Sequence, residues 1–302
     1  MPDNTEHDDR AFSRRQVLIG AGGTGLLAAA GPLLHPDAAS AQRLAGAAAD
    51  GTPEQIHLTW GNDPTASVVV SWASPGRASD PRLILAGQHG GGRRTVAAAE
   101  RVYTDGISGE TVFTYHASAR GLMPGTGYRY QVTAGNDQAA SPFESSFTTA
   151  PAGRSRFRFT SFGDLATPNT RWVLSYGQSK FAVAAVESFA PLFHLLNGDL
   201  CYANLNPMTQ PQVWRDFGNN NQASAANRPW MPCAGNHEIE FNNGPQGLAS
   251  YLTRYQLPDN RVPGFGGRWY SFQVGSVLFV SVDADDVVYQ DAAAFVAGPS
   301  PL

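Results

Sequence analysis

The sequence predicts an all-β sandwich over residues 54–149, followed by an α/β domain over residues 155–302. Up to residue 149, apolar residues alternate with polar ones or form short runs rich in Val, Tyr and Phe, as sandwich strands do. After a Pro- and Gly-containing boundary at 150–154, strand-like runs alternate with a helical pattern, which is typical of α/β layers. Because 42% of the 302 residues are hydrophobic and only 15% are charged, the chain is able to bury a core.

The sandwich prediction rests on four strands and one turn. The predicted strands are Ile56–Trp60, Ser67–Trp72, Val112–Ala117 and Phe143–Thr149. Between the last two, Leu122 and Pro124 precede Tyr128 at the entrance of a further strand, which is the order found in a tyrosine corner. With a length of roughly one hundred residues, this part of the chain resembles a fibronectin type III-like module.

The α/β prediction follows from the runs after residue 155. The predicted elements are strands at Phe157–Phe162, Leu192–Leu196, Pro229–Ala234, Trp269–Val274 and Ser276–Asp283, a helix at Lys180–Phe189 and a polar loop at Asn219–Asn227. His194 lies inside an apolar strand, and we therefore expect it to be a hydrogen-bonded core residue rather than a metal ligand.

The N-terminal segment predicts export. Arg14 and Arg15 precede an apolar stretch at 17–34, and Ala39-Ser40-Ala41 is the small-residue pattern that a signal peptidase cuts. The paired arginines indicate a twin-arginine-type signal peptide over residues 1–41, with cleavage after Ala41 and a linker over 42–53. The expected partner is the twin-arginine export machinery, the expected location is outside the cytoplasm, and no permanent membrane anchor is expected. The G-x-G-x-x-G pattern at Gly20–Gly25 lies inside this leader and follows no strand, so we do not assign it to a dinucleotide.

Charge and cysteine content add two expectations. The formal net charge of -4 gives no indication of a nucleic-acid partner. Cys201 and Cys233 both lie close to polar strand ends, so a disulfide is possible in an oxidising compartment. Two buried thiols are the simpler alternative, because spacing alone does not establish disulfide geometry.

Polar side chains suited to metal binding follow three of the predicted strands. Asp164, Asp199 and Asn236 come directly after strand ends, and Tyr202 follows Asp199 by three residues. In open α/β sheets ligands bind at this edge, and carboxylate, phenolate and amide oxygens suit hard cations. Asp199 is the candidate bridge between two cations, which repel each other unless a shared anion lies between them.

The neighbouring residues indicate the chemistry of such a site. A water or hydroxide bridging the two metals would have a lowered pKa and would act as the nucleophile. His237 is the candidate catalytic residue, which contacts the phosphoryl oxygens or protonates the leaving group. Glu238 is predicted to orient His237 through a hydrogen bond. Asn204 and Asn206 either line the substrate entrance or belong to an ordinary polar loop.

The motifs Gly163-Asp164, Gly198-Asp199-Leu200-Cys201-Tyr202 and Gly235-Asn236-His237-Glu238 resemble those of the purple acid phosphatases, within the calcineurin-like metallophosphoesterases. The resemblance covers roughly residues 54–289 and implies an α/β metallophosphoesterase fold behind the sandwich. It also implies Asp164, Asp199, Tyr202 and Asn236 as ligands of an Fe(III) ion and a divalent Fe, Zn or Mn ion. The implied reaction is hydrolysis of phosphate monoesters, with a tyrosinate-to-iron charge transfer that gives the colour.

The sequence departs from that family in two places. The first family motif reads Asp-x-Gly, whereas Ala166 stands at the Gly position here. The family also has two later motifs that supply three histidine ligands, and no histidine follows His237 in this chain. We therefore expect a C-terminally truncated metallophosphoesterase domain with impaired activity. The alternatives are an exported fragment in which only the sandwich acts, as a binding module, and a phosphodiesterase.

Overall fold

The computed structural model describes residues 51–87, 92–135, 142–166, 179–240, 243 and 247–283. The predicted leader, most of the linker and the segment from residue 284 to the end lie outside the described residues. Residues Leu44–Leu302 form one compact unit, so the sandwich and the α/β part are described together.

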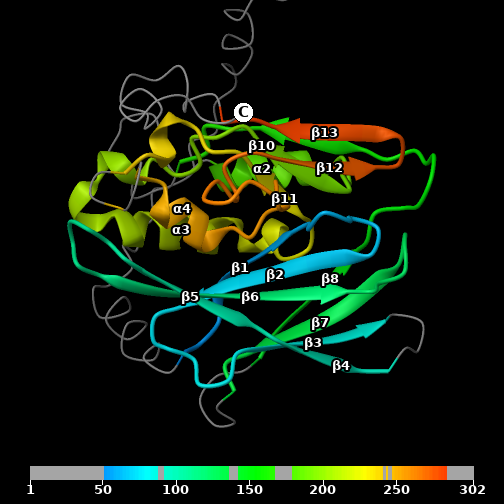
Figure 1. Ribbon diagram of the computed structural model, residues 1–302, viewed down its shortest axis with the longest axis horizontal. Helices are drawn as coiled ribbons and strands as arrows, with labels where there is room; N and C mark the ends of the chain where they lie inside the picture. The colour runs from blue at the N-terminus through cyan, green and yellow to red at the C-terminus, as the bar shows by residue number, and fades with distance from the viewer. Residues whose placement is uncertain are drawn as a thin grey trace, which may run out of the picture. The chain divides into compact units, whose positions relative to one another are not determined.

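Two antiparallel four-stranded sheets form the sandwich (Figure 1). The first holds β1 (Glu54–Thr59), β2 (Ser67–Ser74), β6 (Thr111–Arg120) and β5 (Ala99–Thr104), in that spatial order. The second holds β4 (Arg94–Ala97), β3 (Arg82–Gly87), β7 (Gly127–Thr133) and β8 (Phe143–Thr148). The sequence prediction of an all-β sandwich is confirmed.

The sandwich core is built from the inward-facing residues of both sheets. Trp72 and Tyr115 lie fully inside it and face Tyr130 and Val132 of the second sheet. The tyrosine corner is present, because the Met123 N–H donates to the Tyr128 hydroxyl over 2.8 Å. This bond fixes the turn that leads into β7.

A three-stranded parallel sheet with helices forms the second part of the unit. Its strands are β11 (Trp230–Pro232), β10 (Phe193–Leu196) and β9 (Phe159–Phe162), accompanied by α2 (Ser179–Glu187), α3 (Gln210–Ala225) and α4 (Ala249–Arg254). Antiparallel strands β12 (Tyr270–Val274) and β13 (Val277–Ser281) form a separate hairpin. Short 3₁₀ helices are η1 (Ala203–Leu205), η2 (Pro207–Thr209) and η3 (Asn236–Glu238).

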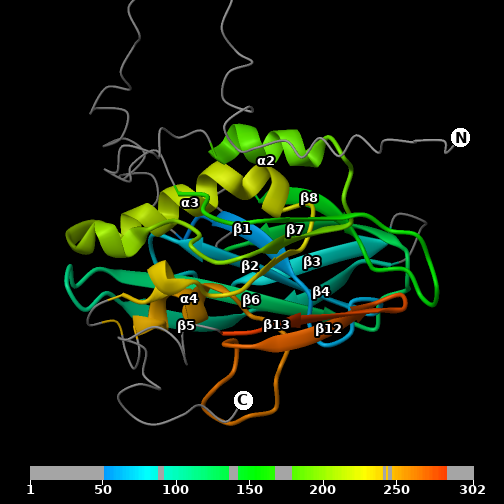
Figure 2. The ribbon, with the colours of Figure 1, turned by 90° about the horizontal axis from the view of Figure 1, so that it is seen from above.

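Strands β10 and β11 of the parallel sheet are covered on both faces, as expected for parallel strands, whereas the edge strand β9 is more exposed. On one face, Leu196 and Trp230 pack with residues of α2 and α3. On the other face, Phe193 and Met231 pack with aromatic residues of the β12–β13 hairpin. Figure 2 shows α2 and α3 on the side opposite to that hairpin.

The helix α3 corrects the sequence prediction. The stretch Asn219–Asn227 was expected to be a polar loop, but α3 continues through Ala225. Its polar residues form hydrogen bonds to the sandwich. Asn219 Oδ1 accepts the Gln55 N–H over 3.0 Å, and Gln222 Oε1 accepts the Ile56 N–H over 2.9 Å. β1 is an edge strand, and these amides bind N–H groups that no neighbouring strand reaches.

The helix α2 occurs where the sequence predicts a helix. Phe181, within it, is 60% exposed, and Phe189, two residues beyond its end, is 57% exposed. Val183 is the buried residue of this helix. Polar contacts therefore contribute more to the docking of α2 than its aromatic residues do.

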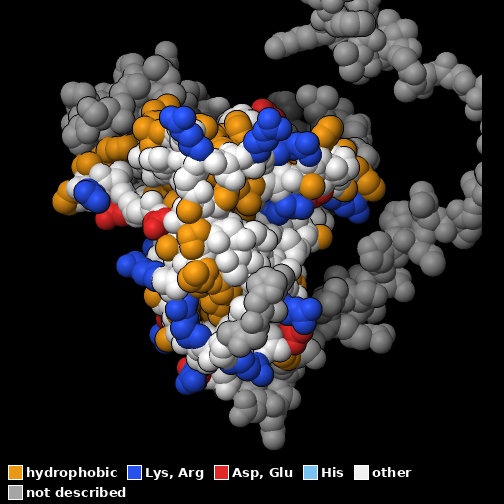
Figure 3. All heavy atoms as spheres, turned by 90° about the vertical axis from the view of Figure 1, so that its right-hand side faces the viewer, with side chains coloured by type: hydrophobic (Ala, Val, Ile, Leu, Met, Phe, Trp, Pro, Cys, Tyr) orange, Lys and Arg blue, Asp and Glu red, His pale blue; other side chains and the backbone are white. Residues whose placement is uncertain are grey.

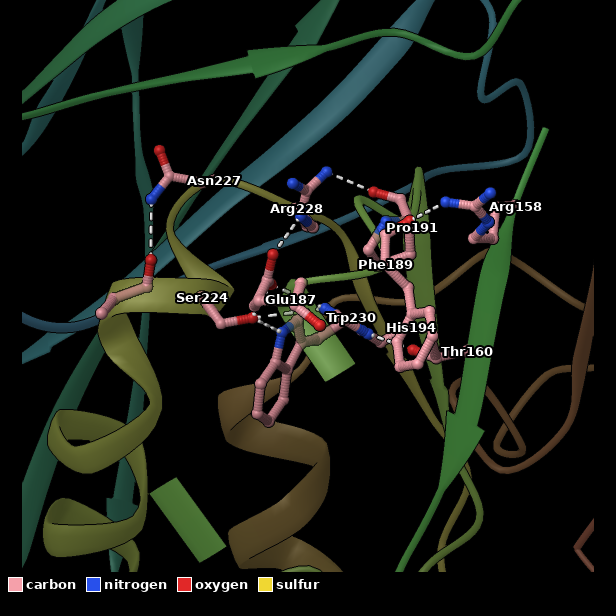
Figure 4. Close-up of polar contacts among 12 residues, drawn as sticks. Arg158, Thr160, Glu187, Phe189, Pro191, His194, Ser224, Asn227, Arg228 and Trp230 are labelled. Atoms are coloured by element: carbon pink, nitrogen blue, oxygen red, sulfur yellow. Dashed lines mark hydrogen bonds and ion pairs between the residues drawn. The ribbon is translucent and has the colours of Figure 1, made fainter. Parts of the chain in front are cut away.

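Those polar contacts centre on Glu187 at the end of α2 (Figure 4). Its carboxylate accepts hydrogen bonds from His194 Nε2 at 2.9 Å, Ser224 Oγ at 2.5 Å and Arg228 Nε at 2.5 Å. Burial alone would raise the pKa of Glu187, but these donors lower it to about 2. His194 is fully buried and also bonds Thr160, so its prediction as a hydrogen-bonded core residue is confirmed.

The sandwich binds the end of α4 through side chains that meet backbone carbonyls. These bonds run from Arg101 to Leu252, from His116 and Thr114 to Thr253, from His57 to Arg254 and from Thr59 to Gln256. Carbonyl groups at a helix C-terminus lack partners within the helix, and the sandwich supplies them here.

The surface of the described residues includes apolar groups on β13 and just after it. Leu278, Val280 and Val282 are 62%, 65% and 57% exposed. Figure 3 shows, on one side of the molecule, hydrophobic patches interrupted by Lys and Arg side chains. None of the helices in the described part of the chain combines the length and hydrophobicity that crossing a bilayer requires.

The contact between the sandwich and α4 predicts a dependence of stability on pH. His116 is 2% exposed, its Nε2–H donates to the Thr253 carbonyl, and its Nδ1 accepts from Ser71. Burial, with smaller contributions from Arg101 and His57, lowers the pKa of His116 to about 3. The unfolded chain takes up this proton below about pH 6.5, so the free energy of unfolding falls as the pH drops from there towards 3.

The variant His116→Gln isolates this contribution, because glutamine does not titrate. Urea unfolding between pH 7 and pH 4 should show a slope up to about 1 kcal/mol per pH unit steeper in the unsubstituted protein than in the variant. Equal slopes in the two proteins would contradict the assignment.

Candidate metal centre

The three motifs meet at the carboxyl ends of the parallel strands. Leu196 of β10 is in register with Phe162 of β9 and with Pro232 of β11, so the loops that follow start at the same level. Pairing continues beyond the strands, since the Asp164 N–H donates to the Gly198 carbonyl at 3.3 Å and the Ala166 N–H to the Leu200 carbonyl at 2.9 Å. The backbone thereby places the first two motifs side by side.

The backbone of these loops is strained. Asp164, Ala166, Asp199 and Tyr202 have φ values of 54°, 58°, 52° and 60°, in the left-handed region that L-residues with a Cβ rarely adopt. Such residues gather at functional sites, where the surrounding structure holds them in place. Ala166, which stands where the family motif has glycine, takes a conformation that favours glycine.

At two positions only glycine fits, because the backbones of the second and third motifs approach each other closely. A Cβ on Gly235 would lie 2.4 Å from Asp199 Oδ1, and a Cβ on Gly198 would lie 2.6 Å from the Gly235 Cα. Neither contact is sterically possible without movement of the backbone. The second and third motifs are therefore packed directly against each other.

The side chains of the predicted site lie close together. The Tyr202 hydroxyl donates to Asp164 Oδ1 over 2.5 Å, and the Tyr202 and His237 rings are 4.4 Å apart. Asp199 Oδ1 accepts the His237 N–H over 3.0 Å. Burial, with the neighbouring carboxylates of Asp164 and Asp199, raises the pKa of the Tyr202 phenol. Asn236 begins η3, between Gly235 and His237.

The contacts of His237 and Glu238 differ from the sequence expectation. Glu238 was predicted to bond His237, but His237 Nδ1 instead pairs with Asn204 Oδ1 at 3.0 Å. The fully buried Glu238 carboxylate accepts the N–H groups of Asp199, Leu200 and Gly235, each at 2.8 Å. Burial raises the pKa of Glu238 to about 8, against the opposite effect of these donors. Glu238 thus supports the backbone around Asp199 rather than the imidazole.

The oxygen atoms at this edge of the sheet are of the chemical types that hard cations prefer as ligands. Asp164, Asp199, Tyr202 and Asn236 offer carboxylate, phenol and amide oxygens, which are ligands for Fe(III) and for divalent ions. Among the described residues, no group of three or more His, Cys, Asp and Glu side chains is arranged to hold a metal ion. A metal at this edge therefore depends on Tyr202 and Asn236 as well as on the two aspartates.

Other polar residues near the motifs have different roles. Both cysteines are thiols in the structure, with Cys201 buried and Cys233 Sγ donating to the Leu196 carbonyl at 3.3 Å. Asp283 forms a buried ion pair with Arg268 at 2.9 Å and lies at the end of the β12–β13 hairpin. A recess of about 590 Å³ is lined by residues of β8, α2 and α3, and no motif residue lines it.

Comparisons with known proteins agree with the fold. Residues 53–149 match the family model of the purple acid phosphatase N-terminal domain. The chain is 38% identical over 322 residues to an uncharacterized protein of Mycobacterium tuberculosis, covering 99% of this chain and 59% of the relative. It is 26% identical to the Fe(3+)-Zn(2+) purple acid phosphatase 12 of Arabidopsis thaliana, covering 76% of this chain and 48% of the relative.

A solved structure supports the same assignment at the level of the fold. The purple acid phosphatase from yellow lupin seeds matches 80% of this chain and 47% of its own, with a TM-score of 0.61 and 18% identity. Residues 53–149 thus belong to the purple acid phosphatase N-terminal domain family, and the chain beyond them is similar to purple acid phosphatases. It spans 47–59% of the length of the three proteins compared here.

Because the Glu238 side chain binds three backbone N–H groups, we expect even a conservative substitution of it to lower the stability of the protein. In Glu238→Gln an amide NH₂ replaces one acceptor oxygen, so at least one buried N–H among Asp199, Leu200 and Gly235 loses its acceptor. We expect a loss of about 1–3 kcal/mol in the free energy of unfolding, measured by denaturant titration. Glu144→Gln, at an exposed strand position, is the matched control and should change stability by less than about 0.5 kcal/mol. Equal effects of the two substitutions would refute the assigned role.

Proposed function

We propose that this protein hydrolyses phosphate monoesters at a dinuclear metal centre held by the loops after β9, β10 and β11. The observation that carries the proposal is the convergence of Asp164, Asp199, Tyr202 and His237 at one edge of the parallel sheet. Similarity to purple acid phosphatases supports the same reaction, because the relatives include the purple acid phosphatase 5 and the Fe(3+)-Zn(2+) purple acid phosphatase 12 of Arabidopsis thaliana.

The proposed ligands divide between two ions. Asp164 and Tyr202, whose oxygens lie 2.5 Å apart, would hold Fe(III), and Asn236 would hold a divalent Fe, Zn or Mn ion. Asp199 would bridge the two, which explains why its backbone is fixed by Glu238 and its Oδ1 by the His237 N–H. When bound, the metal pair supplies a water of lowered pKa and neutralises charge on the phosphoryl group.

His237 is the proposed catalytic residue. Its Nδ1 pairs with Asn204 Oδ1, an acceptor, which assigns a proton to Nδ1 and would leave Nε2 for the substrate. Its ring lies 4.4 Å from the Tyr202 ring, which limits its orientation. With a second proton on Nε2, as in the imidazolium form, this nitrogen would hydrogen-bond a phosphoryl oxygen or give that proton to the leaving alcohol.

The substrate class and location are part of the same proposal. A phosphodiester substrate remains the alternative for this site, because both ester classes share the dinuclear chemistry. The contacts from the sandwich to the end of α4 and to α3 favour the phosphatase over a sandwich that acts alone as a binding module. Arg14 and Arg15 support export by the twin-arginine machinery.

Assay of the exported chain with p-nitrophenyl phosphate, together with metal analysis, tests the proposal. His237→Asn should lower kcat about a hundredfold and leave the metal content unchanged. Asp199→Asn should lose both metal and activity, because the bridge between the ions is weakened. An unsubstituted protein that holds no iron, zinc or manganese and releases no phosphate would refute the proposed function. Comparison with bis(p-nitrophenyl) phosphate separates monoesterase from diesterase activity.

The phenol of Tyr202 gives a spectroscopic test. If Tyr202 binds Fe(III), the iron-loaded protein has a visible charge-transfer band that Tyr202→Phe lacks. Phenylalanine keeps the ring contact with His237, so we expect the far-ultraviolet circular dichroism spectrum to be unchanged. A band of equal intensity in both iron-loaded proteins would exclude Tyr202 as the ligand.

A further inference from the structure

A chain of buried hydrogen bonds runs from the sandwich to the segment that carries His237. The β5–β6 turn supplies its first member, since the Gly106 N–H donates to Asn243 Oδ1 over 2.7 Å. Asn243 Nδ2 donates to Glu240 Oε2 over 3.1 Å. Glu240 lies three residues after His237 and two after Glu238. The sandwich thus reaches the catalytic segment through two consecutive side chains.

The turn that begins this chain is itself held in a fixed shape. Asp105 Oδ1 accepts the N–H groups of Ile107 and Ser108 at 3.2 and 2.6 Å. Its Oδ2 accepts Tyr103 Oη at 3.0 Å and Gln210 Nε2 at 2.9 Å. Asp105 is 1% exposed, so these bonds are shielded from water. The N–H of Gly106 is therefore presented in one direction.

The other end of the chain is equally constrained. Glu240 is 1% exposed, and its Oε1 accepts Trp214 Nε1 over 2.8 Å. Its backbone N–H donates to the Gly247 carbonyl over 3.0 Å, and a Cβ on Gly247 would lie 2.3 Å from the Glu240 carbonyl oxygen. Asn243 is also 1% exposed. Burial of three polar side chains costs free energy unless all of them are bonded, which makes the arrangement specific.

We propose that Asn243 and Asp105 are positioning residues for the reaction at the metal centre, through which the sandwich sets the geometry of the segment 236–240. This inference rests on the proposed function for its catalytic consequence. Neither residue belongs to the proposed metal ligands or is the proposed catalytic residue. Asn243 acts through Glu240, and Asp105 acts by shaping the turn that binds Asn243.

The geometry explains how a small shift would reach the site. Glu238 and Glu240 hold one short stretch from both sides, with Glu238 bonded to the loop after β10 and Glu240 bonded to Trp214 of α3 and to Asn243. If the Asn243 contact is lost, Glu240 keeps its bonds to Trp214 and Gly247 but loses its connection to the sandwich turn, so the stretch is held less tightly at this end. The His237 ring then loses part of its restraint against Tyr202 and Asn204. Groups that support a catalytic residue in this way are commonly worth about 10–100-fold in activity.

The test uses Asn243→Ala in the exported chain, with Thr104→Ala as the matched control. Thr104 bonds Thr111 across the same hairpin at an exposed position and does not contact the segment 236–240. We expect Asn243→Ala to lower kcat about tenfold with little change in KM and in metal content. Thr104→Ala should leave these quantities unchanged.

Amide hydrogen exchange on the metal-free proteins provides a readout that is independent of activity. Asn243→Ala should lose protection in the peptide that spans residues 235–240, while the peptides of β2 and β6 keep theirs. Unchanged protection in 235–240 together with an unchanged kcat would overturn the inference, even if the melting temperature falls, because the role would then be structural only. If Asn243→Ala does not fold, Asn243→Asp is tested by the same two measurements, kcat and exchange protection. Aspartate keeps the size of the side chain and the acceptor for the Gly106 N–H, but it lacks the N–H donor to Glu240.

The outcomes also separate this inference from the proposed function. A protein without metal and without phosphatase activity refutes the proposed function, while the exchange data still report whether the sandwich holds the segment 236–240. An active protein whose Asn243→Ala and Asn243→Asp variants keep full kcat and full protection refutes the positioning role alone.

Discussion

The Glu238 carboxylate holds the ends of two neighbouring strands together, and the candidate metal centre depends on this contact. It binds the N–H groups of Asp199 and Leu200 after β10 and of Gly235 after β11. Because Glu238 is fully buried, water does not compete for these bonds. The loop that carries Asp199 and the loop that carries His237 are therefore joined by buried hydrogen bonds.

The same close packing explains the unusual backbone of the site. The turns after β9 and β10 bring Asp164, Asp199 and Tyr202 to one place only with φ values near 50–60°. Each such residue costs of the order of 1 kcal/mol or more, and continued pairing between the loops offsets part of that cost. The arrangement keeps the oxygen donors close together, which would lower the reorganisation that the proposed cation binding requires.

The sandwich and the α/β part are connected by several hydrogen bonds. Side chains of β1, β5 and β6 bind the carbonyls that end α4, and amides of α3 bind the edge of β1. Tyr251 of α4 in turn donates to the Pro232 carbonyl at the end of β11, over 2.9 Å. The sandwich is thus connected through α4 to the strand that leads into the third motif. A rigid support of this kind suits a site whose ligands come from several separate loops.

The sequence by itself determined the sandwich, the parallel strands and the residues that meet at their ends, because strand periodicity and strand-end motifs are local patterns. It did not reveal that 219–225 belong to α3, since asparagine-rich sequence has low helix propensity and the compensating bonds to β1 come from residues more than 160 positions away. Nor did it reveal the partner of Glu238, which only the packing of β10 against β11 brings within reach. Tertiary structure decided these points because a buried polar group binds whichever donor or acceptor the fold places beside it, regardless of distance along the chain.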